Sequence, residues 1–260
     1  MVLLDLSGLE HVRILSKASA AIFESSVNAL RNPIIKSGLS DFIGHTFLVE
    51  GAVEVCTDER ILDIAEEYCG SPVHLSNHRV YQNRSAIRGT QSWHKDNKLD
   101  FIDENSGEHV TQIVEEDKGL IMILYLSDVD VGGTEFILGS HDIENSREVF
   151  GDEEAHRIGP RIVADGLKSG SAILYDYRMI HRASSVRRTS HRRTSLFAQM
   201  SPNSMPAGEP IFLPSYKIDC LSSRQKAFLC CSNPPSAPNW PIDNTPAISR
   251  IKTALKAILR

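Results

Sequence analysis

Two histidines and one aspartate have the types and the spacing of a metal site. His94 and Asp96 are two residues apart, and His181 lies much further along the chain. Residues two apart on an extended strand project to the same face, so one metal ion could contact both His94 and Asp96. Two imidazoles and one carboxylate form the facial triad that holds non-haem Fe(II) and leaves positions open for a cosubstrate and dioxygen. The spacing therefore predicts an Fe(II) site.

Two adjacent arginines beyond the second histidine extend this chemistry. Arg192 and Arg193 follow His181 at a spacing that a return strand can reach. A guanidinium is a planar fork of donors suited to a carboxylate, which the cosubstrate 2-oxoglutarate would present. Neighbours on a strand face opposite ways, so only one of the two can point into the site. The combination predicts an oxygenase that uses Fe(II), 2-oxoglutarate and O2.

The His-x-Asp pair is a weak signal by itself, because its residue types are common. The alternative for His94 is an ordinary hydrogen-bonded histidine on a strand. Context favours the metal site: a strand and a Gly-containing turn precede His94, another strand precedes His181, and an arginine lies beyond it.

Composition restricts the class of protein. The chain has 260 residues, of which 41% are hydrophobic and 23% charged, and its formal net charge is -5. These values are ordinary for a globular protein, and a single domain spanning residues 1–260 is expected at this length. The net negative charge argues against a general nucleic-acid binder. The sequence indicates no particular oligomeric state.

The expected compartment is the cytoplasm. The cysteines are odd in number and lack C-x-x-C spacing, which predicts reduced thiols without a metal role. The apolar residues 1–6 lack the basic region and the cleavage site of a secretory signal. No apolar run approaches the roughly 18 residues of a membrane span. The five cysteines are Cys56, Cys69, Cys220, Cys230 and Cys231.

Hydrophobic patterning predicts a mainly β fold with flanking helices. Residues 9–30 carry one apolar stripe at helical spacing, and residues 59–69 predict a second, shorter helix. Residues 44–55 mix β-branched and aromatic residues and predict a strand. Short strands with turn signals and inward-pointing ligands predict a double-sheet jelly roll whose mouth holds the site. The further strands are expected at residues 73–82, 119–126, 134–138, 171–177 and 192–200.

Three segments lie outside this strand pattern. The polar segments 97–118 and 142–165 have little periodicity and are expected to shape the substrate pocket. Residues 201–260 contain most of the prolines and are expected to wrap on the core. From residue 245 a basic amphipathic helix is expected, docked on its own domain, with a membrane surface as the alternative. The expected division is flanking helices at 8–70, a jelly-roll core at about 73–200, and the wrap with its helix at 201–260.

A series of motifs resembles the phytanoyl-CoA dioxygenase family. The likeness covers roughly residues 73–200 in matching order, and the series is far more specific than any one motif. It implies a double-stranded β-helix, the jelly roll of cupin-like proteins. The motifs are Trp93-His94-Lys95-Asp96, Leu126-Ser127-Asp128-Val129-Asp130, Gly132-Gly133-Thr134-Glu135-Phe136-Ile137-Leu138-Gly139-Ser140-His141, and Lys168-Ser169-Gly170-Ser171-Ala172-Ile173-Leu174-Tyr175-Asp176-Tyr177 followed by His181.

The resemblance also implies roles for single residues. The family's cosubstrate arginine lies eleven residues past the distal histidine, which is Arg192 here, with Arg193 as the alternative if the loop is one residue longer. Asn77 lies on a strand where related enzymes place a polar cosubstrate contact; the alternative is a surface asparagine near a strand end. The implied iron ligands are His94, Asp96 and His181.

The two faces of the last predicted strand favour Arg192. The smaller and more apolar set of neighbours suits a barrel interior slightly better. Arg192 is therefore expected to bind 2-oxoglutarate. Arg192 shares its face with Thr194, Leu196 and Ala198, and Arg193 shares its face with Ser195, Phe197 and Gln199.

The resemblance implies hydroxylation of a small molecule, with release of succinate and CO2. Related halogenases replace the ligand carboxylate with a small residue, so Asp96 favours hydroxylation, desaturation or ring closure over halogenation. A cluster of arginines would attract an anionic substrate if it lines the pocket; a solvated loop is the alternative. The cluster consists of Arg178, Arg182, Arg187, Arg188, Arg192 and Arg193.

Two other functions remain open. A cupin-like metalloenzyme that does not use 2-oxoglutarate would need the ligands but not Arg192. A non-catalytic binding module on the same barrel would need neither. No residue of the two polar segments identifies the substrate.

Overall fold

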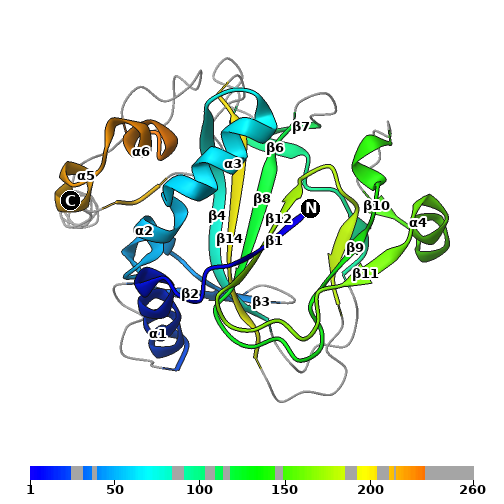
Figure 1. The fold of residues 1–260 in the computed structure, drawn as a ribbon, viewed down its shortest axis with the longest axis horizontal. Helices are drawn as coiled ribbons and strands as arrows, with labels where there is room; N and C mark the ends of the chain where they lie inside the picture. The colour runs from blue at the N-terminus through cyan, green and yellow to red at the C-terminus, as the bar shows by residue number, and fades with distance from the viewer. Residues whose placement is uncertain are drawn as a thin grey trace, which may run out of the picture.

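Two antiparallel β-sheets, one large and one small, form the body of the protein in this computed structural model (Figure 1). The mainly β jelly roll with few helices is the predicted fold, and it is confirmed. The structure describes residues 1–24, 32–36, 40–83, 91–102, 109–113, 118–143, 149–184, 192–203, 211–213 and 215–231, with the backbone alone for 98–102, 109–113 and 215.

The large sheet has seven strands. All six residues of its strand β8 are buried. A strand that is buried on both faces has apolar side chains at every position, which explains the continuous apolar run at residues 119–126. The strands, in order across the sheet, are β1 (Val2–Asp5), β12 (Ser171–Asp176), β8 (Leu120–Tyr125), β14 (Thr194–Pro202), β4 (Val73–Asn83), β3 (Ser40–Ile43) and β2 (Ile34–Lys36).

Strand β14 presents alternate residues to two different layers. Leu196, Ala198 and Met200 belong to the apolar core beneath the helices. Phe197 and Gln199 line a cavity on the opposite side. Because successive side chains of a strand project to opposite faces, this alternation decides which residues of β14 can reach the site.

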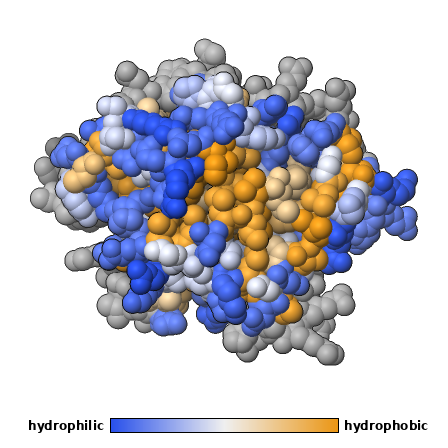
Figure 2. Space-filling model, viewed as in Figure 1, coloured by the Kyte–Doolittle hydropathy of each residue, from blue (hydrophilic) through white to orange (hydrophobic). Residues whose placement is uncertain are grey.

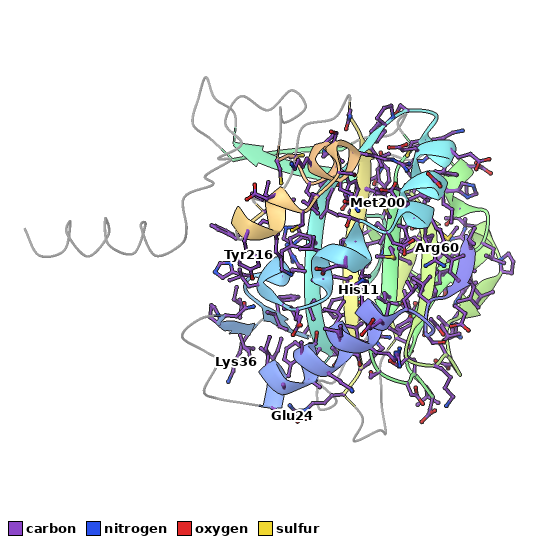
Figure 3. The ribbon with its side chains drawn as sticks, turned by 60° about the vertical axis from the view of Figure 1, so that its left-hand side comes forward. His11, Glu24, Lys36, Arg60, Met200 and Tyr216 are labelled. Carbon is purple, nitrogen blue, oxygen red and sulfur yellow. The ribbon has the colours of Figure 1, made fainter. Side chains whose placement is uncertain are left out.

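Three helices cover one face of the large sheet: α1 (Glu10–Glu24), α2 (Ala52–Cys56) and α3 (Glu59–Cys69). Figure 3 shows them lying against the strands, with His11 on α1 and Arg60 on α3. The Asp58 carboxylate caps α3 by accepting from the Arg60 N–H at 3.1 Å, and Gly70 ends it with a φ of 68°. Among the described residues, no helix is both long and apolar enough to cross a membrane.

The small sheet carries the histidines of the predicted site. Trp93 belongs to an apolar cluster with Phe150, Ile180 and Ala155. Ala155 is part of α4 (Asp152–Ile158), which lies beyond this sheet at the right of Figure 1. The five strands, in order, are β10 (Val149–Phe150), β5 (Trp93–His94), β13 (His181–Ala183), β9 (Thr134–Ile137) and β11 (Arg161–Val163).

Strand β1 is an edge of the large sheet and leaves apolar side chains at the surface. Met1, Val2 and Leu3 are 52%, 46% and 58% exposed. Figure 2 shows an apolar strip near the middle of this view, where β1 lies. Strand β1 therefore forms the edge of the large sheet, and its outward-facing side chains stay exposed.

The strand predicted at residues 44–55 is wrong. This segment forms a short 3-10 helix, η2 (Thr46–Leu48), and then α2. Phe47, Val49 and Val53 are buried in the core beneath the helices. Their β-branched and aromatic character therefore reflects burial, which strands and buried helices share.

The two polar segments contain regular structure that was not predicted. Residues 97–118 include a hairpin of β6 (Lys98–Ile102) and β7 (His109–Ile113). Residues 142–165 include β10, α4 and β11. These elements are too short to give a detectable hydrophobic period. A 3-10 helix, η3 (Ser140–Asp142), ends at the first residue of the second segment.

The flanking helices are described only in part. Of the helix predicted at 9–30, α1 is present, and residues 25–30 lie outside the described residues. The helix predicted from residue 245 also lies outside them. Within 201–260 the described part contains α5 (Ser215–Asp219) and α6 (Ser223–Phe228), which follow the sheet.

Candidate metal centre

The three predicted metal ligands lie together. His94 ends β5, His181 begins β13, and the two residues are paired across the small sheet. Their ring centroids are 4.4 Å apart. One candidate ligand atom from each of His94, Asp96 and His181 lies within 4.8 Å of the others. No second group of this kind is found in the part of the chain that the structure describes.

The hydrogen bonds of the two imidazoles fit a metal ion. His94 Nδ1 lies 2.9 Å from Ser92 O, and His181 Nδ1 lies 3.0 Å from Met179 O. A carbonyl oxygen only accepts, so each Nδ1 is the donor, and in the neutral form of the ring this leaves the lone pair on Nε2. The Nε2 atoms lie 3.5 Å and 3.2 Å from the Asp96 carboxylate oxygens. Backbone carbonyls thus orient both rings, as they do for metal-bound histidines.

A cavity of about 620 Å³ contains these ligands. Its walls come from both sheets, so the site lies between them. Polar residues prevail near the ligands, and Ile123 and Phe197 are apolar parts of the wall. The lining residues are Ser40, Phe42, Asn77, Arg79, Tyr81, Asn83, Gln91, His94, Asp96, Ile123, Thr134, Tyr175, His181, Ala183, Arg193, Phe197 and Gln199.

Arg193, not Arg192, enters the cavity. Arg193 is 5% exposed, donates from Nη1 to Gly132 O, and has no partner for its buried Nε. Its guanidinium lies 5.8 Å from the centroid of the Tyr125 ring. Arg192 is exposed, and its Nη1 lies 3.3 Å from Gln82 Oε1. The cavity therefore holds one of the two predicted arginines.

The expectation that Arg192 points into the barrel is wrong. The physical reason is that both faces of β14 are buried, so an apolar face need not be the one that lines the cavity. The small apolar residues that share the face of Arg192 pack beneath the helices. The polar and aromatic set with Arg193 lines the cavity. The apolar face of β14 therefore belongs to the helical layer, and the face with Arg193, Phe197 and Gln199 belongs to the cavity.

Asn77 lies in the cavity wall, on β4 opposite Gln199 of β14. Its Oδ1 is buried and has no hydrogen-bond partner. A buried polar atom without a partner carries a free-energy cost unless a ligand or water satisfies it. The surface position considered for Asn77 is therefore excluded, and its side chain is available to a bound molecule.

Two residues beside the ligands were not predicted. The Tyr175 hydroxyl lies 3.2 Å from His181 Nε2. Burial, with a contribution from the Asp96 charge, holds the pKa of Tyr175 well above its ordinary value, so the hydroxyl stays protonated. Gln91 Nε2 lies 3.2 Å from His94 Nε2, and Gln91 Oε1 accepts from the Ala183 N–H at 3.2 Å. A tyrosine inside an apolar strand was the one available signal, since its hydroxyl needs a partner.

The predicted arginine cluster does not act as a unit. Arg178 pairs with Asp176 at 2.7 Å, and Arg182 pairs with Glu135 at 2.7 Å. Neither lines the cavity. Residues 187 and 188 lie outside the described residues. The solvated-loop alternative does not hold for Arg178 or Arg182, because both are engaged in ion pairs and largely buried.

Gly133→Ala is expected to destabilise the fold beside Arg193. A Cβ at Gly133 would lie 2.0 Å from Ala164 O. Ala164 cannot withdraw cheaply, because its N–H donates to Thr134 O at 2.9 Å. Overpacking of this kind costs about 1–3 kcal/mol, which should lower the melting temperature by several degrees. Thermal unfolding followed by circular dichroism measures it.

The matched control is Gly8→Ala, because no atom lies within 4 Å of a Cβ at Gly8. Its melting temperature should equal that of the wild type. An unchanged melting temperature for Gly133→Ala would contradict the close approach of Gly133 to residue 164.

Comparisons with known proteins agree with this geometry. The family model for phytanoyl-CoA dioxygenase (PhyH) matches residues 39–195, which is more than half of the chain and includes all three candidate ligands. A search of curated proteins found no match. Structures of known proteins share the fold, as the following three show.

The epimerase SnoN, solved with Fe3+, alpha-ketoglutarate and nogalamycin RO, has a TM-score of 0.56 at 19% identity over 80% of this chain and 81% of its own. HygX from Streptomyces hygroscopicus, solved with nickel, 2-oxoglutarate and hygromycin B, has a TM-score of 0.57 at 12% identity over 82% and 86%. EctD from S. alaskensis in its apoform has a TM-score of 0.59 at 19% identity over 81% and 79%. With its family model matched across the site, the chain belongs to the phytanoyl-CoA dioxygenase family.

Proposed function

We propose that the protein is an Fe(II)- and 2-oxoglutarate-dependent dioxygenase that hydroxylates a small anionic molecule and releases succinate and CO2. The observation that carries the proposal is the convergence of His94, Asp96 and His181 in a cavity that also holds the buried Arg193. The family supports it, and so do SnoN and HygX, whose structures contain a metal ion with alpha-ketoglutarate or 2-oxoglutarate.

His94, Asp96 and His181 would hold the iron. Bound there, the iron would supply the activation of dioxygen that is coupled to decarboxylation of 2-oxoglutarate. Three protein ligands leave positions open for the cosubstrate, as the facial triad does in general. Asp96 occupies the position at which a small residue would make room for a halide, so its carboxylate supports hydroxylation over halogenation.

Arg193 would bind the far carboxylate of 2-oxoglutarate. His181 is paired with Phe136, whereas Arg193 contacts Gly132 O, at the other end of the same segment of chain. The guanidinium is therefore displaced along the strands from the ligands, and an extended dicarboxylate can bridge the two. The buried Nε without a partner provides a donor for it. Asn77 is a candidate for a second polar contact.

The part of the cavity formed by β3 and β4 supports an anionic substrate. Arg79 lies in this wall, with its guanidinium 5.3 Å from the centroid of the Phe42 ring. Ser40 is also part of the wall. A second cation beside an aromatic ring suits a molecule that carries a carboxylate or phosphate next to an apolar portion.

The test has two steps: binding of 2-oxoglutarate is measured without oxygen, and turnover is then measured with oxygen. Anaerobic addition of Fe(II) and 2-oxoglutarate should give a weak visible charge-transfer band that Fe(II) alone does not give. Admission of O2 with a panel of carboxylic acids and their neutral amides should then release succinate faster with an acid than with its amide. Absence of both the band and succinate release would overturn the proposal.

The same experiment separates the alternatives. A cupin-like metalloenzyme without 2-oxoglutarate would bind Fe(II) but give no band with the cosubstrate. A non-catalytic module would release no succinate with any substrate. The position of Arg193 in the same cavity as the ligands favours the oxygenase over both, because neither alternative needs a buried guanidinium there.

A further inference from the structure

A polar network lies on the outer face of the small sheet, directly behind the candidate ligands. Trp93 precedes His94, and Arg182 follows His181, so both project away from the cavity. The Arg182 guanidinium lies 4.1 Å from the centroid of the Trp93 ring. It also donates from Nε to Glu135 Oε2 at 2.7 Å. Trp93, the neighbour of His94, is therefore in contact with Arg182, the neighbour of His181.

Two further elements join this network. Asp152, the first residue of α4, accepts from Trp93 Nε1 at 2.8 Å and from Arg182 Nη1 at 2.6 Å. Arg161 on β11 donates to Glu135 at 3.1 Å and 2.8 Å. The Glu135 side chain is only 3% exposed, so this carboxylate is satisfied by two guanidinium groups. The network thus connects β5, β13, β9, β11 and α4.

The backbone alone holds the two histidine strands weakly. Strand β5 has two residues, β13 has three, and the pairing between them consists of His181 with His94. Beyond this pair, the backbone joins the two segments where the Asp96 N–H donates to Tyr177 O at 2.9 Å, so few backbone contacts fix the two short strands laterally. Side chains must therefore supply the rigidity that a metal site requires.

We propose that Arg182 is a positioning residue for the metal centre: by stacking on Trp93 and bonding to Glu135 and Asp152, it clamps the strand of His94 to the strand of His181. The inference rests on the proposed metal site. It assigns a role to side chains that never touch the metal and lie outside the cavity. Loss of a partner that bonds directly to a metal ligand typically weakens metal binding by about 10- to 100-fold, and loss of Arg182, which acts through the neighbouring residues, is expected at the lower end of that range.

The test is a Co(II) titration of the wild type and of Arg182→Met, in which the visible d–d absorption of the bound Co(II) is monitored. Arg182→Met should raise the Kd for Co(II) by about tenfold and change the d–d spectrum. Removal of a positive charge would by itself strengthen cation binding, so weaker binding cannot come from the lost charge. Arg182→Lys keeps the charge but not the planar fork, and it should restore the affinity only in part.

Arg60→Met is the matched control. Arg60 is also an arginine in an ion pair, 2.9 Å from Asp58, but on α3 outside the metal site. Its Co(II) affinity and spectrum should equal those of the wild type. Melting temperatures measured without metal show whether a variant has lost stability in general. A general loss of stability would leave the spectrum of the bound Co(II) unchanged, whereas a displaced ligand would alter it.

The outcomes distinguish the two proposals. If the wild type binds no Co(II), the proposed metal site is wrong. If the wild type binds Co(II) and Arg182→Met binds it with the same Kd and spectrum, the clamp is wrong and the metal site stands. Should Arg182→Met fail to fold, Arg182→Lys decides, because it keeps the charge but loses the planar fork that stacks on Trp93 and bonds to both Glu135 and Asp152; it should raise the Kd about fivefold. An unchanged Kd there overturns the clamp.

Discussion

Asp96→Ala is expected to abolish both metal binding and turnover of 2-oxoglutarate. Asp96 is the only carboxylate of the candidate triad, and its oxygens lie 3.5 Å and 3.2 Å from the two histidine Nε2 atoms. Without it, two neutral imidazoles remain, with no negative charge to balance the ion. The loss should exceed the roughly 100-fold that removal of an outer partner can cost. Succinate release and Fe(II) affinity measure it.

The matched control is Asp130→Ala, since Asp130 is exposed and lies in a turn. Its turnover should equal that of the wild type. His94→Ala should behave as Asp96→Ala does. Succinate release in either variant at a rate comparable to that of the wild type would remove the triad assignment, whatever the fate of the other proposals.

Arg193→Gln is expected to raise the KM for 2-oxoglutarate by at least about 30-fold, while its neighbour Arg192→Gln leaves it unchanged. Truncation of one partner of a buried charge pair costs about 2–5 kcal/mol, and every 1.4 kcal/mol is tenfold. Glutamine keeps an uncharged polar group on a similar stem at this buried position, so the variant should fold. The anaerobic band, titrated with 2-oxoglutarate, measures the affinity directly.

The two adjacent variants form an internal comparison. Both remove one positive charge from the same strand end, but Arg193 lines the cavity and Arg192 is exposed. If Arg192→Gln carried the loss and Arg193→Gln did not, the cosubstrate would lie on the other face of β14. An equal and small effect of both would show that neither arginine binds the far carboxylate of 2-oxoglutarate.

The ligand set is the part of this protein that the sequence determined best. His94 is the last residue of β5 and Asp96 lies just beyond it, so a separation of two residues along the chain already brings these two ligands close together. The third ligand, His181, reaches the site only through the fold. It follows an apolar strand typical of a sheet centre, so its place near the other two ligands could be predicted from the order of the strands. The jelly roll followed from the same short strands and turns.

The choice between Arg192 and Arg193 depended on the tertiary structure. Alternation along residues 194–200 separates two faces, but both faces are buried, one by helices and one by the cavity. The pattern alone does not say which buried face is the barrel interior. In this protein the interior is the more polar one, because it must satisfy charged and hydrogen-bonding ligands.

Other features could emerge only from the packing of distant segments. The strand predicted at residues 44–55 shares its composition with a buried helix, and neighbours decide between them. Arg79 and Phe42 meet on adjacent strands, and Arg182 reaches Glu135 and Asp152 from separate strands and a helix. Sequence determines the period and polarity of each element by local chemistry. Which elements then face each other is decided by long-range contacts that no local pattern encodes.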